Sequence, residues 1–281
     1  MKTDFSILWV DDNSEFVDSL AGPLKTWMDE QGFSLVVYPH KGEAGVENDI
    51  KTKEIELIIL DYKLRGNKKG DEIIKNIRDK NYYQDIVFYS GGPIPNEVFA
   101  TPLDGVFTVE KKDAKERIKS LIALKIKRVS DLATFRGWVV ADSIELEGVL
   151  GRVLSKCFKE QKDVFMKCVL GHEGLFDFYK KHMVLNNLLH DRLEELNKVG
   201  NTASVAKVQA CKKILDAFSD EVIHIRNALA HQVAVDGETG HKKIKVKGKR
   251  KEFLNTPENL IKIRKDLKRH RDNLLELEAA L

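Results

Sequence analysis

The chain has 281 residues, of which 42% are hydrophobic and 32% charged, and its formal net charge at pH 7 is +3. This length predicts about two domains, and no apolar run is long enough to span a bilayer. The N-terminus lacks the pattern of a secretory signal, so we expect a cytoplasmic protein without a membrane partner. Cys157, Cys168 and Cys211 lack CxxC spacing, which argues against a disulfide framework and against a zinc site.

Five short apolar runs in the first half predict strands: Phe5–Val10, Ser34–Tyr38, Leu57–Leu60, Ile86–Tyr89 and Gly105–Val109. Helical patterns separate these runs, and one more helical pattern follows the last. The alternation predicts five βα units, which form a doubly wound parallel sheet. We therefore expect an α/β domain over residues 1–128.

Polar residues directly follow four of these strands. Asp11 and Asp12 follow ILWV, Asp61 follows LIIL, Ser90 follows IVFY and Lys111 follows FTVE. The carboxyl ends of parallel strands converge on one edge of the sheet, so these side chains are expected to meet there. Clustered carboxylates suit Mg²⁺, which prefers oxygen ligands. With a metal to screen an incoming phosphoryl group, Asp61 becomes a plausible nucleophile.

The second half has long helical periods, over Asp131–Phe158, Gly174–Val199, Ala203–His231 and Pro257–Leu281. They predict an all-α bundle over residues 129–281. Between the last two helices the sequence alternates around Asp236–Gly240, which predicts a β-hairpin inserted at about 232–250.

The two halves also differ in charge. Residues 1–125 hold 18 Lys/Arg and 22 Asp/Glu, a net charge of −4, whereas residues 126–281 hold 29 and 22, a net charge of +7. The basic excess is densest in HKKIKVKGKRK, residues 241–251. Two interpretations stay open: a surface that binds a phosphate backbone, and a solvated loop. In the first, the residues that contact nucleic acid are Lys242, Lys243, Lys245, Lys247, Lys249, Arg250 and Lys251.

The motifs LWVDDN, LDYKL, YSGG and VEKKD, in this order and at these separations, resemble the receiver domain of two-component response regulators. The resemblance implies that Asp61 accepts a phosphoryl group from a histidine kinase or another phosphodonor. It further implies an Mg²⁺ site made by Asp11, Asp12, Asp61 and the backbone carbonyl of Lys63, and a phosphoryl-binding role for Ser90 and Lys111. The alternative is that these are ordinary polar residues of an α/β fold.

Two departures from the receiver pattern concern regulation. Lys112-Asp113 follows Lys111 where the family usually has a proline, and the aromatic Phe107 precedes Lys111 by four residues instead of three. We therefore expect an altered aromatic switch.

The segment IHIRNALAHQ, residues 223–232, ends a long helical pattern. At about 100° per residue, Asp220, His224, Asn227 and His231 form one polar stripe. Val222, Ile225 and Leu229 lie on the opposite side. Arg226 lies away from the polar stripe, so it joins His231 only by reaching round the helix or across a symmetric partner.

The pattern Arg226-Asn227-Ala228-Leu229-Ala230-His231 within a helical bundle resembles the HEPN superfamily of ribonucleases. The resemblance implies a homodimer with a composite RNA-cleaving site that needs no metal, and catalytic or site-shaping roles for Arg226, Asn227 and His231. The products would be a 2′,3′-cyclic phosphate and a 5′-hydroxyl. In the alternative, Arg226 forms a salt bridge and His231 is a helix C-terminal residue favoured by the macrodipole.

The leading hypothesis is a metal-independent endoribonuclease regulated by phosphorylation of Asp61, of the kind found among toxins and antiviral defence effectors. A second hypothesis is a non-catalytic module that dimerises or binds RNA under control of the receiver. A third is a signalling scaffold whose helical half binds another protein.

Overall fold

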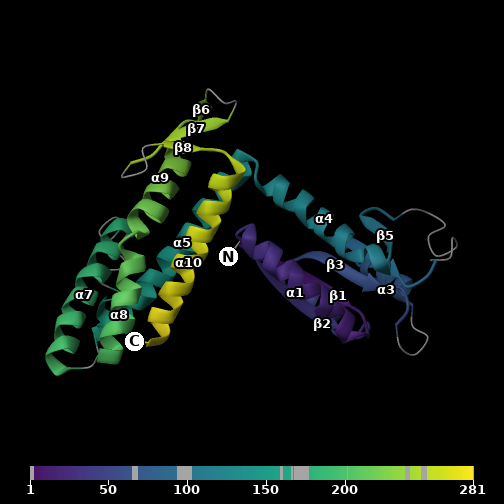
Figure 1. Ribbon diagram of the computed structural model, residues 1–281, viewed down its shortest axis with the longest axis horizontal. Coiled ribbons are helices and arrows are strands. Elements are labelled where there is room, and N and C mark those ends of the chain that lie inside the picture. Colours follow the sequence, from purple (N-terminus) through teal and green to yellow (C-terminus); the bar gives the residue numbers. More distant parts are fainter. Residues whose placement is uncertain are drawn as a thin grey trace. The chain divides into compact units, whose positions relative to one another are not determined.

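A computed structural model gives the fold, and it describes residues 3–64, 69–93, 103–158, 161–165, 167, 177–200, 202–237, 241–247 and 252–280. The chain divides into two compact units, an N-terminal unit of Lys2–Val129 and a C-terminal unit that begins at Ser130 (Figure 1). Each unit has a hydrophobic core of its own. None of the described helices combines the length and the apolar character needed to cross a membrane.

Strands and helices alternate through the N-terminal unit. In chain order they are β1 (Asp4–Val10), α1 (Ser14–Glu30), β2 (Ser34–His40), α2 (Val46–Thr52), β3 (Ile55–Asp61), α3 (Gly70–Asp79), β4 (Asp85–Ser90), β5 (Val106–Glu110), the 3₁₀ turn η3 (Lys111–Asp113) and α4 (Ala114–Val129). The helix expected between β4 and β5 falls on residues 94–102, outside the described residues.

The five strands form one parallel sheet in the order β2-β1-β3-β4-β5, as the sequence predicts for a doubly wound domain. The inner strands are nearly continuous apolar runs because helices cover both faces of the sheet. One face carries Trp9 and Tyr89 and packs against α1 and α4. The other carries Leu8 and Leu60 and packs against α2 and α3. This burial fixes the register of the inner strands β1, β3 and β4, and hence the position of the polar residue at the end of each.

The turn after β1 is fixed by two short side-chain contacts. The Asn13 carboxamide oxygen accepts a hydrogen bond from the backbone N–H of Phe16 at 3.0 Å and thereby caps α1. The Asp11 carboxylate in turn accepts from the backbone N–H of Asn13 at 2.7 Å. Asp11 is therefore held by the backbone of the turn that starts the helix.

Helices make up most of the C-terminal unit. In chain order its elements are α5 (Leu132–Cys157), α6 (Lys162–Phe165), α7 (Phe178–Val199), α8 (Thr202–Leu215), the π-helical turn η6 (Ser219–Ile223), α9 (His224–His231), β6 (Val235–Asp236), β7 (Lys242–Lys245), β8 (Glu252–Leu254) and α10 (Pro257–Ala280). The core is built from apolar side chains of α5, α7, η6, α9 and α10. The prediction of a helical second half is confirmed.

The prediction of one continuous helix over Ala203–His231 is wrong. α8 ends at Leu215, a turn at Asp216 and Ala217 breaks the helix, the π-helical turn begins at Ser219, and α9 begins at His224. A π-helical turn accommodates an extra residue through i→i+5 hydrogen bonds, and such turns often lie near functional sites. A periodicity of 3.6 residues does not reveal it, because the apolar residues on either side still look helical.

Two buried histidines lie close to this π-helical turn. The His182 Nε2 atom lies 2.8 Å from the backbone oxygen of Leu215, and the His182 ring stacks on Phe218. Phe218 also meets the His270 ring edge-on, and His270 Nε2 lies 2.8 Å from Oε2 of Glu221 within the turn. Burial lowers the pKa of both histidines, that of His270 to about 4. Both rings are therefore neutral near pH 7.

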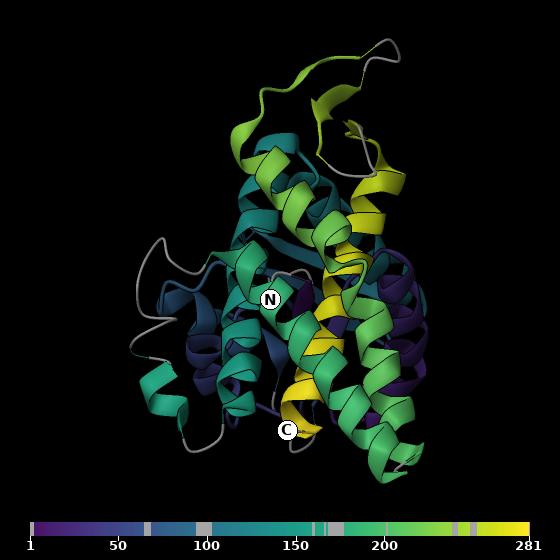
Figure 2. The same cartoon turned by 90° about the vertical axis from the view of Figure 1, so that its left-hand side faces the viewer.

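The three short strands form an antiparallel sheet with β7 in the middle, at one end of the helical unit (Figure 2). The sequence predicts a two-stranded hairpin here, and the pairing of β7 with β8 adds a third strand. Ile244 of β7 lies opposite Phe253 of β8, and both side chains are only 1% exposed. They anchor the sheet in the helical core and leave Lys242 and Lys245 exposed to solvent.

Candidate functional site

The polar residues predicted at the strand ends of the N-terminal unit come together at the carboxyl edge of the sheet. Asp61 is the last residue of β3 and Ser90 the last residue of β4, while Asp11 directly follows β1 and Lys111 directly follows β5. In the sheet, Asp61 is in register with Tyr89, so Ser90 lies one position further along the same edge.

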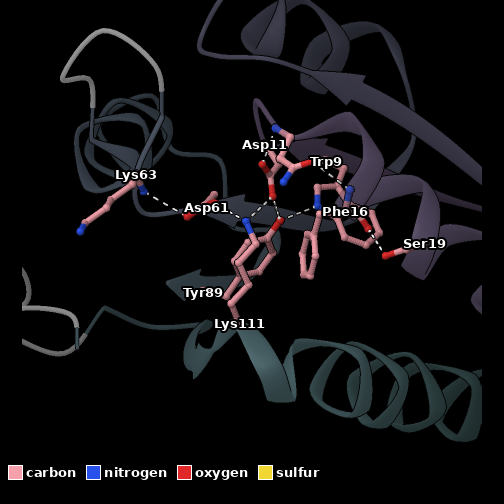
Figure 3. A network of polar contacts seen from close by, with 9 residues as sticks. Trp9, Asp11, Phe16, Ser19, Asp61, Lys63, Tyr89 and Lys111 are labelled. Carbon is pink, nitrogen blue, oxygen red and sulfur yellow. Dashed lines mark hydrogen bonds and ion pairs between the residues drawn. The ribbon is translucent and has the colours of Figure 1, made fainter. Parts of the chain in front are cut away.

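A lysine joins two of these carboxylates. The Lys111 Nζ atom lies 2.7 Å from Oδ2 of Asp61 and 3.1 Å from Oδ2 of Asp11 (Figure 3). The side chains of Asp11 and Asp61 are 0% and 7% exposed, and that of Lys111 is 23% exposed. Two carboxylates and one ammonium leave a negative balance in a largely buried site, which favours a further cation.

Burial and pairing act against each other on the Asp61 carboxyl. Burial raises its pKa, and this outweighs the lowering by the Lys111 ammonium and by the backbone N–H of Lys63, which donates to Asp61 Oδ1 at 3.1 Å. For Lys111, burial lowers the pKa, but the hydrogen bonds to Asp61 and Asp11 outweigh it, so its pKa is raised overall. Lys111 is therefore firmly cationic, and Asp61 gains from any positive charge brought next to it.

Aromatic side chains that the sequence motifs do not include surround the Lys111 ammonium and the Asp11 carboxylate. The Lys111 ammonium lies 4.3 Å from the ring centre of Phe16 and 5.2 Å from that of Tyr89. The Tyr89 hydroxyl donates to Asp11 Oδ2 at 2.5 Å and accepts from Trp9 Nε1 at 2.9 Å. Burial raises the Tyr89 pKa, which keeps the hydroxyl protonated as a donor. The available signal in the sequence was their spacing: Trp9 lies two positions before Asp11, and Tyr89 lies one position before Ser90.

The remaining predicted residues lie nearby. Asp12 is half-buried next to Asp11, and the buried Ser90 hydroxyl accepts a hydrogen bond from the backbone N–H of Gly92 at 3.3 Å. Within the described part of the chain, no group of three or more His, Cys, Asp or Glu side chains has the geometry of a metal site. The oxygen donors of Asp11 and Asp61 nevertheless fit Mg²⁺, which is commonly held by one or two carboxylates and several waters.

A close backbone approach lies against the same edge. The Gly70 N–H donates to the backbone oxygen of Tyr62 at 2.9 Å. A Cβ atom added at Gly70 would lie 2.3 Å from the backbone oxygen of Asp61 and 2.2 Å from a methyl carbon of Leu60. Only glycine allows α3 to begin this close to the end of β3.

The strand order of the N-terminal unit is one of the common orders of doubly wound domains, in which ligands bind outside the carboxyl ends of the strands. Comparison with solved structures finds similar chains. One is a CheY-like response regulator receiver domain from Methanospirillum hungatei, with 22% identity and a TM-score of 0.35 over 44% of this chain and 98% of that chain. Another is the RcsB response regulator from Salmonella typhimurium, with 16% identity and a TM-score of 0.35 over 60% of this chain and 90% of that chain.

No family model matches the chain, and no curated protein does. The strand order and the polar edge together define the N-terminal unit as a doubly wound α/β domain with a polar site at the carboxyl edge of its sheet.

The C-terminal unit has a polar pocket of about 300 Å³ beside α9. Residues of α9 and its end form one wall, and lysines of β7 and the residues after it form the other. The residues that line it are His224, Asn227, Ala228, His231, Gln232, Lys245 and Lys247. No carboxylate is among these described lining residues, so the pocket suits an anionic ligand.

The three predicted catalytic residues divide between the pocket and its flank. Asn227 and His231 line the pocket. Arg226 does not line the pocket, but its half-buried side chain donates from Nη1 to the carboxamide oxygen of Asn227 at 2.8 Å. The predicted apolar stripe is buried, with Val222, Ile225 and Leu229 each 1% exposed.

The basic run is also divided. Lys245 and Lys247 line the pocket, whereas Lys242 pairs with Asp236 at 2.5 Å and Lys243 lies 3.8 Å from Glu252. Lys249, Arg250 and Lys251 lie outside the described residues. His224 and Gln232 also line the pocket, although neither belongs to the predicted catalytic set of Arg226, Asn227 and His231. The signal in the sequence that could have identified His224 was its position on the same polar stripe of the helix as His231.

Proposed function

We propose that the N-terminal unit is a phosphorylatable receiver and that Asp61 is its phosphoacceptor. The observation that carries this proposal is the Lys111 ammonium placed between Asp61 and Asp11 at the carboxyl edge of the sheet. In the reaction, an Asp61 oxygen attacks the phosphorus of a phosphodonor, such as a phosphohistidine of a kinase, and the bond from phosphorus to the leaving group breaks. Lys111 then pairs with the added negative charge, and Ser90 hydrogen-bonds a phosphoryl oxygen.

Mg²⁺ fits this function because it would screen the charge of the incoming phosphoryl group. Asp11, Asp12, Asp61 and the backbone carbonyl of Lys63 are the residues proposed to hold it. When the Lys111 ammonium pairs with the phosphoryl group, it gives up its hydrogen bond to Asp11. Asp11 still accepts a hydrogen bond from the Tyr89 hydroxyl.

Labelled acetyl phosphate with Mg²⁺ tests the acceptor directly. We expect the full-length chain to incorporate phosphate and Asp61→Ala to lose it. Glu110→Gln is the matched control, because Glu110 is an exposed carboxylate at the same end of the sheet, paired with Lys112 at 2.7 Å. Labelling that persists in Asp61→Ala would exclude Asp61 as the acceptor.

We further propose that the C-terminal unit is an RNA-directed effector whose activity the receiver regulates, and that it cleaves RNA without a metal as a homodimer. The carboxylate-free pocket that joins His231 and Asn227 to Lys245 and Lys247 favours this candidate. The lysines attract the phosphate backbone, and the imidazole of His231 is a group that can transfer a proton to or from the reacting RNA. The resemblance of the Arg226-to-His231 segment to HEPN ribonucleases agrees with this chemistry, as does a role as a toxin or antiviral defence effector.

The test is incubation of the full-length protein with total RNA in EDTA, before and after phosphodonor treatment. We expect fragments that end in a 2′,3′-cyclic phosphate from the wild type and none from His231→Ala. His190→Ala is the control, since His190 is an exposed histidine of α7 with 65% exposure. RNA binding that weakens with salt but yields no fragments would instead identify a non-catalytic RNA-binding module.

A further inference from the structure

Cleavage of RNA by attack of the 2′-hydroxyl requires two proton transfers. A base removes the proton from the 2′-oxygen as that oxygen attacks phosphorus, and an acid gives a proton to the 5′-oxygen as its bond to phosphorus breaks. The motif that the sequence predicts offers one group for these transfers, His231. Arg226 is unsuitable because a guanidinium stays protonated, and its side chain donates to Asn227 and does not line the pocket.

A second histidine lies on the same pocket. His224 is the first residue of α9, two helical turns before His231, and both line the pocket. Seven residues of α-helix correspond to about 10 Å along the axis, which leaves room for a phosphodiester group between the two rings.

His224 is also oriented by a carboxylate. Its Nδ1 atom lies 3.1 Å from Oδ1 of Asp220, which belongs to the π-helical turn η6. With a neutral ring, this contact requires the proton on Nδ1, which leaves Nε2 as the basic nitrogen. The side chains of His224 and Asp220 are 24% and 26% exposed, so the pair is sheltered but accessible to a ligand.

Resting on the ribonuclease function proposed above, we propose that His224, held by Asp220, is a second catalytic residue, so that one chain contains both proton-transfer groups. His224 accepts the proton of the ribose 2′-hydroxyl, and the 2′-oxygen attacks phosphorus. The bond from phosphorus to the 5′-oxygen breaks, and His231 gives its proton to that oxygen. Lys245 and Lys247 on the opposite wall bind the phosphate. Asp220 is a positioning residue.

Rates of RNA cleavage in EDTA by full-length variants test the role of His224. We expect His224→Ala and His224→Gln to lower the rate about 100-fold or more, as for loss of a general base. Asp220→Asn should lower it about tenfold or more, because the tautomer is no longer fixed. The matched control is the pair His190 and Glu194, whose Nε2 and Oε1 atoms lie 3.6 Å apart at the same i, i+4 spacing on α7. His190→Ala and Glu194→Gln should change the rate less than about twofold.

The pH–rate profile distinguishes catalysis from a structural effect. A base and an acid acting together give a bell-shaped profile, so His224→Gln should remove one limb and His231→Gln the other. Loss of fold would lower all rates without removing a limb. A bell-shaped profile that persists at full rate in both His224 variants overturns the inference and leaves the ribonuclease function standing.

Mixed dimers test whether both groups act in one chain. In co-expressed His224→Ala and His231→Ala chains, each protomer lacks one group, so we expect cleavage no faster than in either single variant. Restored cleavage would mean that the two histidines act across copies, which overturns the single-chain site. If the wild type yields no fragments even after phosphodonor treatment, the ribonuclease function and this inference fail together.

Discussion

Replacing Tyr89 by phenylalanine tests the buried aromatic network most directly, because it removes a single oxygen and keeps the ring. That oxygen donates to Asp11 Oδ2 at 2.5 Å and accepts from Trp9 Nε1 at 2.9 Å. The side chains of Trp9 and Tyr89 are 0% exposed, so water does not replace the lost partner.

The magnitude follows from these two contacts. A buried N–H left without an acceptor costs about 1–3 kcal/mol, and a hydrogen bond to a charged group contributes about 1.5–3 kcal/mol. Asp11 keeps its hydrogen bonds from Lys111 and from the backbone N–H of Asn13, which limits the cost of losing the bond from Tyr89. We therefore expect Tyr89→Phe to lower the free energy of unfolding of the N-terminal unit by about 2–4 kcal/mol.

Hydrogen exchange of the full-length protein measures this loss unit by unit. Peptides from β1 and β4 should exchange roughly 30- to 700-fold faster in Tyr89→Phe than in the wild type. Peptides from the C-terminal unit should exchange at the same rate in both proteins. Tyr83→Phe is the control, because Tyr83 is 71% exposed and its hydroxyl bonds Asn81 on the surface. Exchange in Tyr89→Phe within about threefold of Tyr83→Phe would refute the energetic role of this network.

Three further predictions concern stability. Because the folded His270 pKa of about 4 lies below its usual value of 6.5, the unfolded state binds more protons between these values. The free energy of unfolding should thus fall by up to about 3 kcal/mol as the pH falls from 6.5 to 4. Urea titrations at several pH values should show that this free energy depends less on pH in His270→Phe. Gly70→Ala should lower the free energy of unfolding by about 2 kcal/mol or more, because the added Cβ atom has no room. Gly22→Ala should not lower it, because Gly22 has open space around it, and urea titration measures both variants. The raised pKa of Asp61 means that its ionisation opposes folding, so in EDTA Asp61→Asn should be more stable than the wild type at pH 7, with the difference vanishing near pH 3.

The N-terminal sheet was predictable because each of its strands contains a short apolar run, and polar residues follow four of these runs. Burial of the run fixes the register, and the register places the terminal residue at the edge. The location of Asp61 and Lys111 at this edge could therefore be predicted from position alone. The contacts of Trp9 and Tyr89 could not, because an aromatic residue in a strand has the same pattern whether its polar atom is bonded or not.

In the C-terminal unit, helical periodicity correctly indicated that Val222, Ile225 and Leu229 are buried and that Asn227 and His231 are exposed. It did not reveal that Arg226 turns to Asn227, because side-chain direction depends on the neighbouring residue and not on the spacing. It also missed the third strand, since the three residues Glu252–Leu254 are too few for an alternation to stand out.

The π-helical turn at Ser219–Ile223 runs directly into α9 and sets the rotational phase of that helix relative to Phe218, which is buried in the core. One residue corresponds to about 100° of rotation about a helix axis, so the extra residue in the turn decides which side of α9 faces the core. Removing one residue there would turn Ile225 and Leu229 outward and carry His224 and His231 away from the lysines of the small sheet. The orientation of the whole candidate site thus depends on an insertion that carries none of the predicted motif.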